Sequence, residues 1–167
     1  MADEGELLEG TTELIIGQRY QRHITVPPPG TGKDWSLWVP GGVRWRLLSL
    51  VIGYTSNTDT GNRVLFLALE RESINVAMCP AGILQQPSQG LLYCWFPGAA
   101  LVTTLTVGGV HTAPVPSCWL DAGWRYYLPI PGAYVGDAWS VANVLVEEER
   151  VGPPAPRQIV RTVPIVE

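Results

Sequence analysis

The chain has 167 residues, enough for one domain with a substantial core, and 46% of them are hydrophobic while only 16% are charged. This charged fraction is well below the roughly 25% of ordinary soluble domains, which favours a surface that partners cover. The net charge of −4, with no basic cluster, excludes an electrostatic footprint for nucleic acid, and no apolar run approaches the ~18 residues of a membrane span. We therefore expect neither nucleic acid nor a membrane as a partner.

The two ends of the chain differ in composition from its middle. Residues 1–12 are acidic and lack a hydrophobic period, which predicts an N-terminal arm and is unlike the basic start of a secretory signal. After Arg150 a Pro-rich spacer leads to an apolar, β-prone stretch, so residues 151–167 are predicted to form an extended C-terminal arm. Residues 13–150 are expected to form a single β-sandwich domain of a soluble protein made in a cytoplasm.

The first predicted strand covers residues 13–26, where apolar and polar residues alternate. Three consecutive prolines, Pro27 to Pro29, end it because proline cannot donate to a β-ladder. A short strand is predicted over residues 35–39 and stops at Pro40.

The central part of the chain consists of two β-rich runs, 45–54 and 62–71, joined by the turn-forming residues 55–61, and this pattern predicts a hairpin. In the first run the apolar parity shifts at Leu47 and Leu48, which indicates a β-bulge or burial on both faces.

The second run is apolar at both its even and its odd positions. We therefore expect a strand that is covered on one face by a second sheet and on the other by an arm, a loop or a neighbouring subunit. One parity carries Val64, Phe66 and Ala68; the other carries the candidate interface residues Leu65, Leu67 and Leu69.

Further strands are predicted over residues 74–79, 91–96, 101–107, 124–130 and 138–147, with an edge strand or extended loop over 114–120. Turn signals recur about every 8–12 residues and no helical period is convincing, which is typical of a two-sheet protein. The sequence therefore predicts an all-β, antiparallel β-sandwich, with a jelly roll as the first choice.

No motif in the sequence indicates catalysis, a cofactor or a metal. Residues 29–34 are similar to a phosphate-binding loop but lack its first glycine and its Ser or Thr after Lys33, so a flexible turn is the better interpretation. Residues 57–61 offer oxygen ligands at alternate positions, but a single carboxylate favours an ordinary turn over a calcium loop. We expect a protein that is not an enzyme and has no cofactor.

The histidines, cysteines and Asp137 are likewise interpreted structurally. His23 and His111 stand alone without ligand spacing, so each is predicted to be a surface imidazole. Asp137 lies in a Gly-containing turn, where Asp commonly bonds its own backbone. An odd number of cysteines without paired spacing predicts buried free thiols. These are Cys79, Cys94 and Cys118.

The role of the seven tryptophans has two interpretations. Packing in the core or in subunit interfaces is favoured, and Trp119, Trp124 and Tyr126 are candidate interface residues. The alternative is a sugar-stacking platform made of these three residues and Tyr127, as in carbohydrate-binding modules.

Two blocks of the sequence, together with its acidic and Pro-rich ends, carry a family resemblance over roughly residues 43–150. The blocks are Trp45…Thr55…Gly61-Asn62-Arg63-Val64 and Leu128-Pro129…Ala133…Gly136-Asp137…Val146-Glu147-Glu148. They resemble tailed-bacteriophage virion proteins of the small β-sandwich kind. The resemblance implies a jelly roll that assembles as a trimer or higher ring and sits on the capsid as a decoration protein, or at the collar or tail.

We therefore expect a structural virion component, a capsid decoration (cement) protein that forms a homo-oligomer, with a trimer favoured. The major capsid protein or other virion subunits would be its partners, contacted through an arm that carries Ile159, Val160, Val163 and Ile165. One alternative is a collar, tail or head-fibre component with a carbohydrate-binding β-sandwich. The other is a cupin-like metalloenzyme, which ranks last because it needs a histidine cluster and this chain has two histidines.

Overall fold

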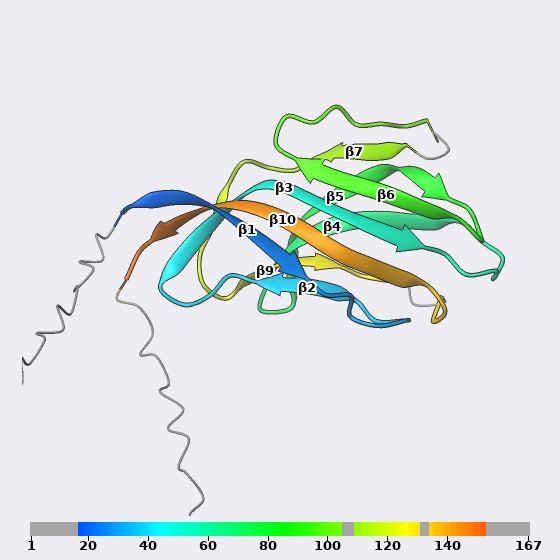
Figure 1. The fold of residues 1–167 in the computed structure, drawn as a ribbon, viewed down its shortest axis with the longest axis horizontal. Coiled ribbons are helices and arrows are strands. Elements are labelled where there is room, and N and C mark those ends of the chain that lie inside the picture. The colour runs from blue at the N-terminus through cyan, green and yellow to red at the C-terminus, as the bar shows by residue number, and fades with distance from the viewer. Residues whose placement is uncertain (1–16, 105–108, 131–133, 153–167) are drawn as a thin grey trace, which may run out of the picture.

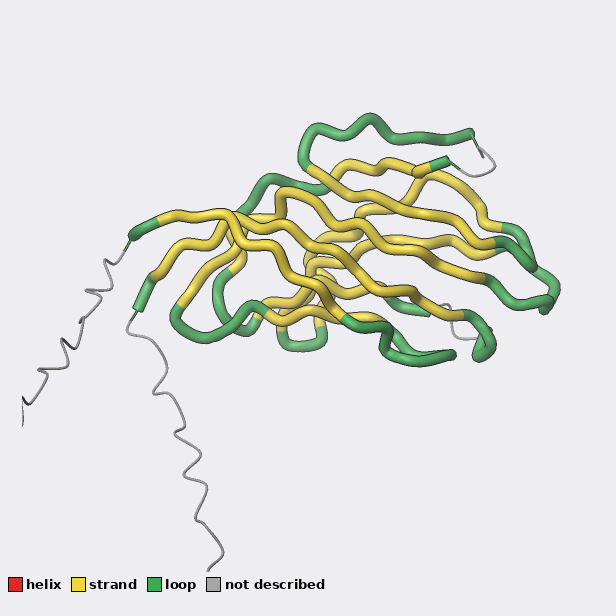
Figure 2. Tube along the Cα trace, in the orientation of Figure 1, coloured by secondary structure: helices red, strands yellow, loops and turns green. Residues whose placement is uncertain are grey.

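A computed structural model describes residues 17–104, 109–130 and 134–152, which form two β-sheets with no helix among them (Figures 1 and 2). The strands are β1 (Arg19–Val26), β2 (Trp35–Trp38), β3 (Val43–Thr55), β4 (Arg63–Arg71), β5 (Ile74–Gln85), β6 (Gly90–Phe96), β7 (Val110–Pro114), β8 (Trp119–Leu120), β9 (Trp124–Leu128) and β10 (Ala138–Arg150). The predicted all-β, antiparallel sandwich is confirmed. In the described part of the chain there is no helix long and apolar enough to cross a membrane.

The first sheet has the strand order β1-β10-β3-β6-β7, with β8 beside β3, and the second has the order β2-β9-β4-β5. Every pair is antiparallel except β6 and β7, which run parallel. The last strand, β10, lies between β1 and β3, so both ends of the domain meet in one sheet (Figure 1).

The predicted hairpin over residues 45–71 is wrong, because β3 and β4 belong to different sheets. Residues 56–62 form a turn, as their composition predicts, but this turn carries the chain across from one sheet to the other. Strand β4 instead forms a hairpin with β5 through a two-residue turn at Glu72 and Ser73, whose φ angles of 52° and 64° match a type I′ turn.

A β-bulge lies where the apolar parity shifts in β3. The register passes from Ser49 opposite Leu145 to Leu47 opposite Val146, which leaves Leu48 without a partner in β10. The core face of β3 consequently changes from odd to even positions, and the predicted bulge is confirmed.

Several predicted boundaries shift. In the predicted strand 101–107, residues 101–104 are not in a strand and 105–107 lie outside the described residues. Instead, the backbone N–H of Val102 donates to the carbonyl of Thr112, so this segment lies along the edge of β7. The predicted N-terminal arm, 1–12, and residues 153–167 of the predicted C-terminal arm, 151–167, also lie outside the described residues, and with them Ile159, Val160, Val163 and Ile165.

The core between the sheets is rich in large aromatic side chains. Trp95 packs against Tyr93 at a centroid distance of 5.7 Å, and Tyr54 packs against Trp139 at 4.5 Å. Branched aliphatic side chains fill the remaining space, among them Leu47, Leu50, Ile52, Leu67, Leu128, Val144 and Val146. Most tryptophans therefore serve packing, the favoured interpretation.

The three cysteines are free, as predicted, but only Cys79 is buried, while Cys94 and Cys118 are half-buried. Burial raises the pKa of each thiol, so each stays protonated and unreactive near neutral pH. The prediction of a surface imidazole is wrong for His111, which is buried, whereas His23 is exposed.

Candidate interaction surfaces

The three candidate leucines of β4 do not face a partner. Leu65, Leu67 and Leu69 are each at most 3% exposed and point into the core between the sheets. The other parity of β4 faces outward, with Val64 55% exposed and Phe66 half-buried. The interface predicted on this strand was therefore placed on the wrong face, and the outward residues are the ones that could contact a partner.

The outer surface of the second sheet is apolar over β4 and β5. The register sets Val64 beside Leu84, Phe66 beside Pro80 and Ala68 beside Met78. Leu84 and Met78 are 54% and 57% exposed. Ala68 is fully buried, so we call the other five residues, Val64, Phe66, Met78, Pro80 and Leu84, the outer apolar face. Apolar side chains clustered in this way on a folded domain mark an interaction site more often than scattered ones do.

One side of the outer apolar face has a polar and aromatic rim. The buried carboxylate of Glu70 accepts a hydrogen bond of 2.8 Å from Nε of Arg125, its neighbour on β9. The same guanidinium lies 5.0 Å from the ring of Trp38 and 4.2 Å from that of Tyr127. Aromatic, Met and Arg side chains are the residue types enriched in protein interfaces relative to the rest of the surface.

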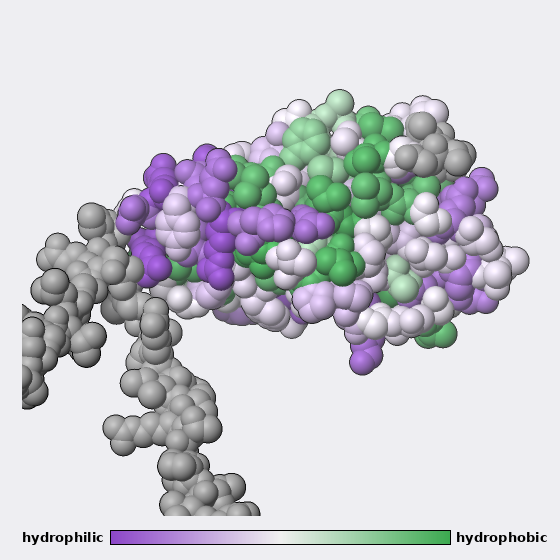
Figure 3. All heavy atoms as spheres, in the orientation of Figure 1, coloured by the Kyte–Doolittle hydropathy of each residue, from purple (hydrophilic) through white to green (hydrophobic). Residues whose placement is uncertain are grey.

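The outer surface of the first sheet is divided into two parts (Figure 3). Hydrophilic residues gather at the end where β1, β3 and β10 meet, while much of the remainder is apolar. At the hydrophilic end the half-buried ring of Trp119 lies 5.1–5.4 Å from the guanidinium carbons of Arg19, Arg44 and Arg46. Arg19 and Arg44 also pair with Glu149. Trp119 is therefore an aromatic contact for arginines, not an open platform.

The predicted sugar platform is not assembled in the structure. Trp124 and Tyr126 point toward the core, where Tyr126 is fully buried, whereas Tyr127 faces outward from the second sheet and Trp119 belongs to the first. Trp38, which the sequence analysis did not single out, is 51% exposed beside Tyr127.

A buried ion pair joins two distant segments at one end of the sandwich. Arg63 and Asp137 are both fully buried, with Nε of Arg63 2.9 Å from Oδ2 of Asp137. The carboxylate also accepts hydrogen bonds from the hydroxyl of Tyr54 at 2.5 Å and from the backbone N–H of Asn57 at 2.7 Å. Asp137 thus bonds a distant arginine, and the prediction that it serves its own turn missed this role.

The pKa of Asp137 reflects these contacts. Burial alone would raise the pKa of this carboxyl, but the hydrogen bonds from Arg63, the Asn57 backbone and Tyr54 outweigh burial and lower it below its ordinary value.

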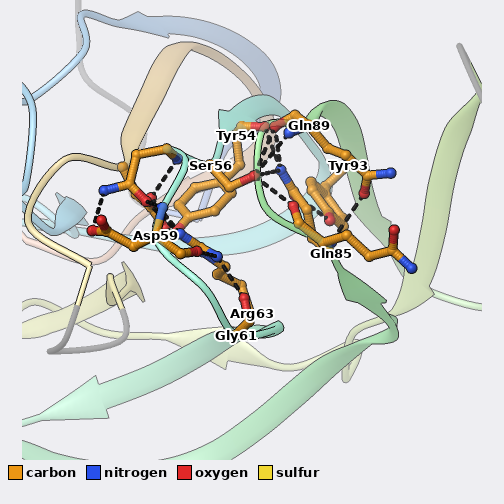
Figure 4. Close-up of polar contacts among 11 residues, drawn as sticks. Tyr54, Ser56, Asp59, Gly61, Arg63, Gln85, Gln89 and Tyr93 are labelled. Carbon is orange, nitrogen blue, oxygen red and sulfur yellow. Dashed lines mark hydrogen bonds and ion pairs between the residues drawn. The ribbon is translucent and has the colours of Figure 1, made fainter.

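The guanidinium of Arg63 also occupies the crossover turn that offered oxygen ligands. It donates to the carbonyls of Asp59 and Gly61 at 2.9 and 2.5 Å, as the dashed lines in Figure 4 show. Its remaining nitrogen donates to Oδ1 of Asn57. A side-chain cation therefore bonds two carbonyls and the Asn57 amide oxygen of this turn, while the Asp59 carboxylate accepts from Nδ2 of Asn57. Elsewhere in the described ranges, no three His, Cys, Asp or Glu side chains group around a possible metal position.

The second polar cluster in Figure 4 centres on Gln85, which is fully buried. Its Oε1 accepts a 2.7 Å hydrogen bond from the hydroxyl of Tyr93, and its Nε2 donates to the carbonyl of Gln89 at 2.7 Å. Ser56 Oγ donates to the carbonyl of Gln86. Because these groups satisfy one another, the cluster fixes the β5–β6 loop against the crossover and leaves no polar atom of Gln85 for a ligand.

Glu148 is a third buried carboxylate, 2% exposed on β10. It accepts hydrogen bonds from Nε1 of Trp45 at 2.7 Å, from Arg22 at 3.1 Å and from the hydroxyl of Tyr20. Burial would raise the pKa of Glu148, but the bonds from Tyr20, Trp45 and Arg22 lower it below its ordinary value. Its neighbour Glu149 also has a lowered pKa, mainly because Arg19 donates to it.

Acid is expected to destabilise the domain through these carboxylates. Groups with lowered pKa values contribute stability above their unfolded-state pKa, near 4, and this contribution disappears as the pH falls through the lower folded values. Replacing Glu148 with glutamine removes the negative charge from the acceptor of these hydrogen bonds, so it should lower stability at pH 7 by about 1.5–3 kcal/mol and flatten the acid dependence. Thermal unfolding from pH 7 to 2.5 measures both effects.

Glu72 provides the matched control for this experiment, since its side chain is 81% exposed. Glu72→Gln should leave both the melting temperature and its acid dependence close to those of the parent protein. An acid profile of Glu148→Gln identical to that of the parent would contradict the role assigned to Glu148.

Fold and surfaces together define an antiparallel β-sandwich with a complete core, internally satisfied polar clusters and an exposed apolar face. No known protein family, curated protein or solved structure matches this chain. Its function must therefore be inferred from its own surfaces.

Proposed function

We propose that the protein is a structural virion component, a capsid decoration protein that forms a homo-oligomer, with a trimer favoured, and attaches to neighbouring shell subunits with its arms. The observation that carries this proposal is the outer apolar face. The core is complete without that face, yet Val64, Met78 and Leu84 remain more than half exposed to water. A covering subunit would remove this apolar area from water, which is the main driving force for assembly.

The distribution of charge supports a protein that is covered by others. No Asp, Glu, Lys or Arg occurs from Ser73 to Leu120, the stretch that contains β5 to β8. Interface cores are depleted in charged residues, whereas free surfaces of soluble domains usually carry them.

Strand order supports the resemblance to small virion sandwiches, and we infer from it a jelly roll. Without β7 and β8, the strand orders of the two sheets are β1-β10-β3-β6 and β2-β9-β4-β5. These are the strand orders that result when one long antiparallel double strand wraps around a core. Jelly rolls recur in viral capsid proteins, lectins and cupins. Because one fold serves many functions, the surfaces and not the fold select the structural role.

A carbohydrate-binding collar, tail or head-fibre module is the second candidate. It is favoured by Trp38, which is 51% exposed and lies with Tyr127 around one guanidinium on an outer face. Stacking on such rings would change tryptophan fluorescence when polysaccharide is added, and Trp38→Ala would abolish that change. An unchanged fluorescence spectrum would remove this candidate.

The decisive experiment for the proposed function asks whether the chain is part of a particle. Virus particles are purified from a culture whose genomes include the gene for this chain. Mass spectrometry should detect the intact chain in these particles. Gold-labelled antiserum against the purified protein should bind their surface in electron micrographs. Particles that lack the chain, while the same lysate contains it as free protein, would overturn the proposed function.

A further inference from the structure

The two sheets have four outer edges, and three of them are protected in ways that native proteins commonly use against unwanted strand pairing. Strand β1 carries Arg19 and Arg22 and is followed by prolines. Strand β2 has only four residues, and β7 is covered because Val102 and Ala100 both bond Thr112.

The fourth edge, β5, carries no charge and no proline over residues 74–78, and its one irregularity there is a register shift that leaves Val76 without a partner in β4. Among the described residues, no backbone hydrogen bond joins residues 74–78 to any segment other than β4. Ile74, Val76 and Met78 are each more than half exposed. We call residues 74–78 the open edge. An uncharged, apolar, unpaired strand edge is a template for another β-strand.

The C-terminal arm contains a segment that matches the open edge in length and chemistry. Residues 158–163 read Gln-Ile-Val-Arg-Thr-Val, contain no proline and include four β-branched side chains. Six residues can pair along the five of the open edge, and apolar side chains on both parities suit an edge that is exposed on both faces.

Gly152, the last described residue of the chain, lies at the same end of the sandwich as the open edge. The N–H of Val151 bonds the carbonyl of Gly42, while Val39, three residues before Gly42, bonds Trp124. Trp124 pairs with Arg71, which is paired with Ile74 at the start of the open edge.

Between Gly152 and the β-prone segment the sequence places three prolines, Pro153, Pro154 and Pro156. Proline-rich spacers favour an extended conformation of about 3.1 Å per residue, which would carry the segment away from its own sandwich and toward an adjacent copy.

We propose that residues 158–163 of one copy add as a strand to the open edge of β5 in a neighbouring copy. The added strand would extend the second sheet and bring apolar side chains next to the outer apolar face, since Met78 belongs to both surfaces. Strand addition gains main-chain hydrogen bonds for affinity and side-chain contacts for specificity. This proposal rests on the proposed function, because it identifies the surface that the arm of a shell subunit would hold.

The test uses a synthetic peptide of residues 153–167, titrated into the protein shortened to residues 1–152. We expect saturable binding in the micromolar range by calorimetry. Val76→Lys places a charge on the open edge and should weaken binding at least tenfold. Val141→Lys, at an exposed position of the first sheet, should not. A peptide with Val160→Pro loses a main-chain donor and should not bind.

Circular dichroism melts of the shortened protein and both lysine variants verify that each domain is folded. Light scattering then compares the full-length and shortened proteins, and the full-length oligomer should lose mass when residues 153–167 are removed.

Absence of peptide binding to folded protein, or binding that Val76→Lys leaves unchanged, would overturn the proposal. If the peptide binds but the full-length protein is a monomer, the arm pairs with β5 of its own chain. This result would also contradict the proposal. Detection of the chain in particles is independent of all these results, so the proposed function can stand if this inference fails.

Discussion

Replacing Asp137 with alanine is expected to lower the free energy of unfolding by about 3–5 kcal/mol, because it leaves the fully buried Arg63 guanidinium without its counter-ion. The hydroxyl of Tyr54 and the backbone N–H of Asn57 also lose their acceptor. Chemical denaturation at pH 7, followed by tryptophan fluorescence, measures the change.

Asp59 provides a control for this loss, since it is an exposed carboxylate in the adjacent turn. Asp59→Ala should cost less than about 1 kcal/mol. The double variant Arg63→Met, Asp137→Leu removes both charges and should be less destabilised than Asp137→Ala, because no uncompensated charge remains buried. A loss below about 1 kcal/mol for Asp137→Ala would mean that the ion pair does not hold the crossover.

Leu67→Ala is expected to destabilise the domain by about 2–5 kcal/mol, since the leucine is fully buried between the sheets and its truncation leaves a cavity. Val64→Ala, three residues earlier on the opposite face, should cost less than about 1 kcal/mol because Val64 is 55% exposed. Thermal unfolding of the two variants in parallel tests which face of β4 is the core. Equal losses would contradict the assignment of the outer apolar face.

The sequence predicted features that depend on local periodicity. The spacing of strands and turns identified the sandwich, and the parity shift at Leu48 located a bulge that the register contains. The composition of residues 55–61 predicted that the chain turns there, but not which sheet the following strand joins. The sheet that a strand joins depends on pairing strands far away in the sequence. No residue in that turn indicates which strands these are.

The outward face of β4 was ambiguous for a related reason. Charged residues occur on both parities of this strand, with Glu70 on one and Arg63 and Arg71 on the other. A buried arginine is uncommon, so Arg63 gives no local sign that its side of the strand faces the core. Its partner Asp137 lies 74 residues later, so no local pattern could have joined them. The rim residues Trp38 and Arg125 also come together only through the pairing of β2 with β9.

The position of β10 has a consequence for biosynthesis. Because β10 lies between β1 and β3, the first sheet cannot close until residues 138–150 have left the ribosome. A nascent chain that ends earlier exposes the apolar inner face of β3 to water, and β1 has no neighbour to pair with. Closure of this sheet thus waits for β10 and is expected to be slow, as for other proteins dominated by non-local pairing. Such a chain would need protection from aggregation while it is being made.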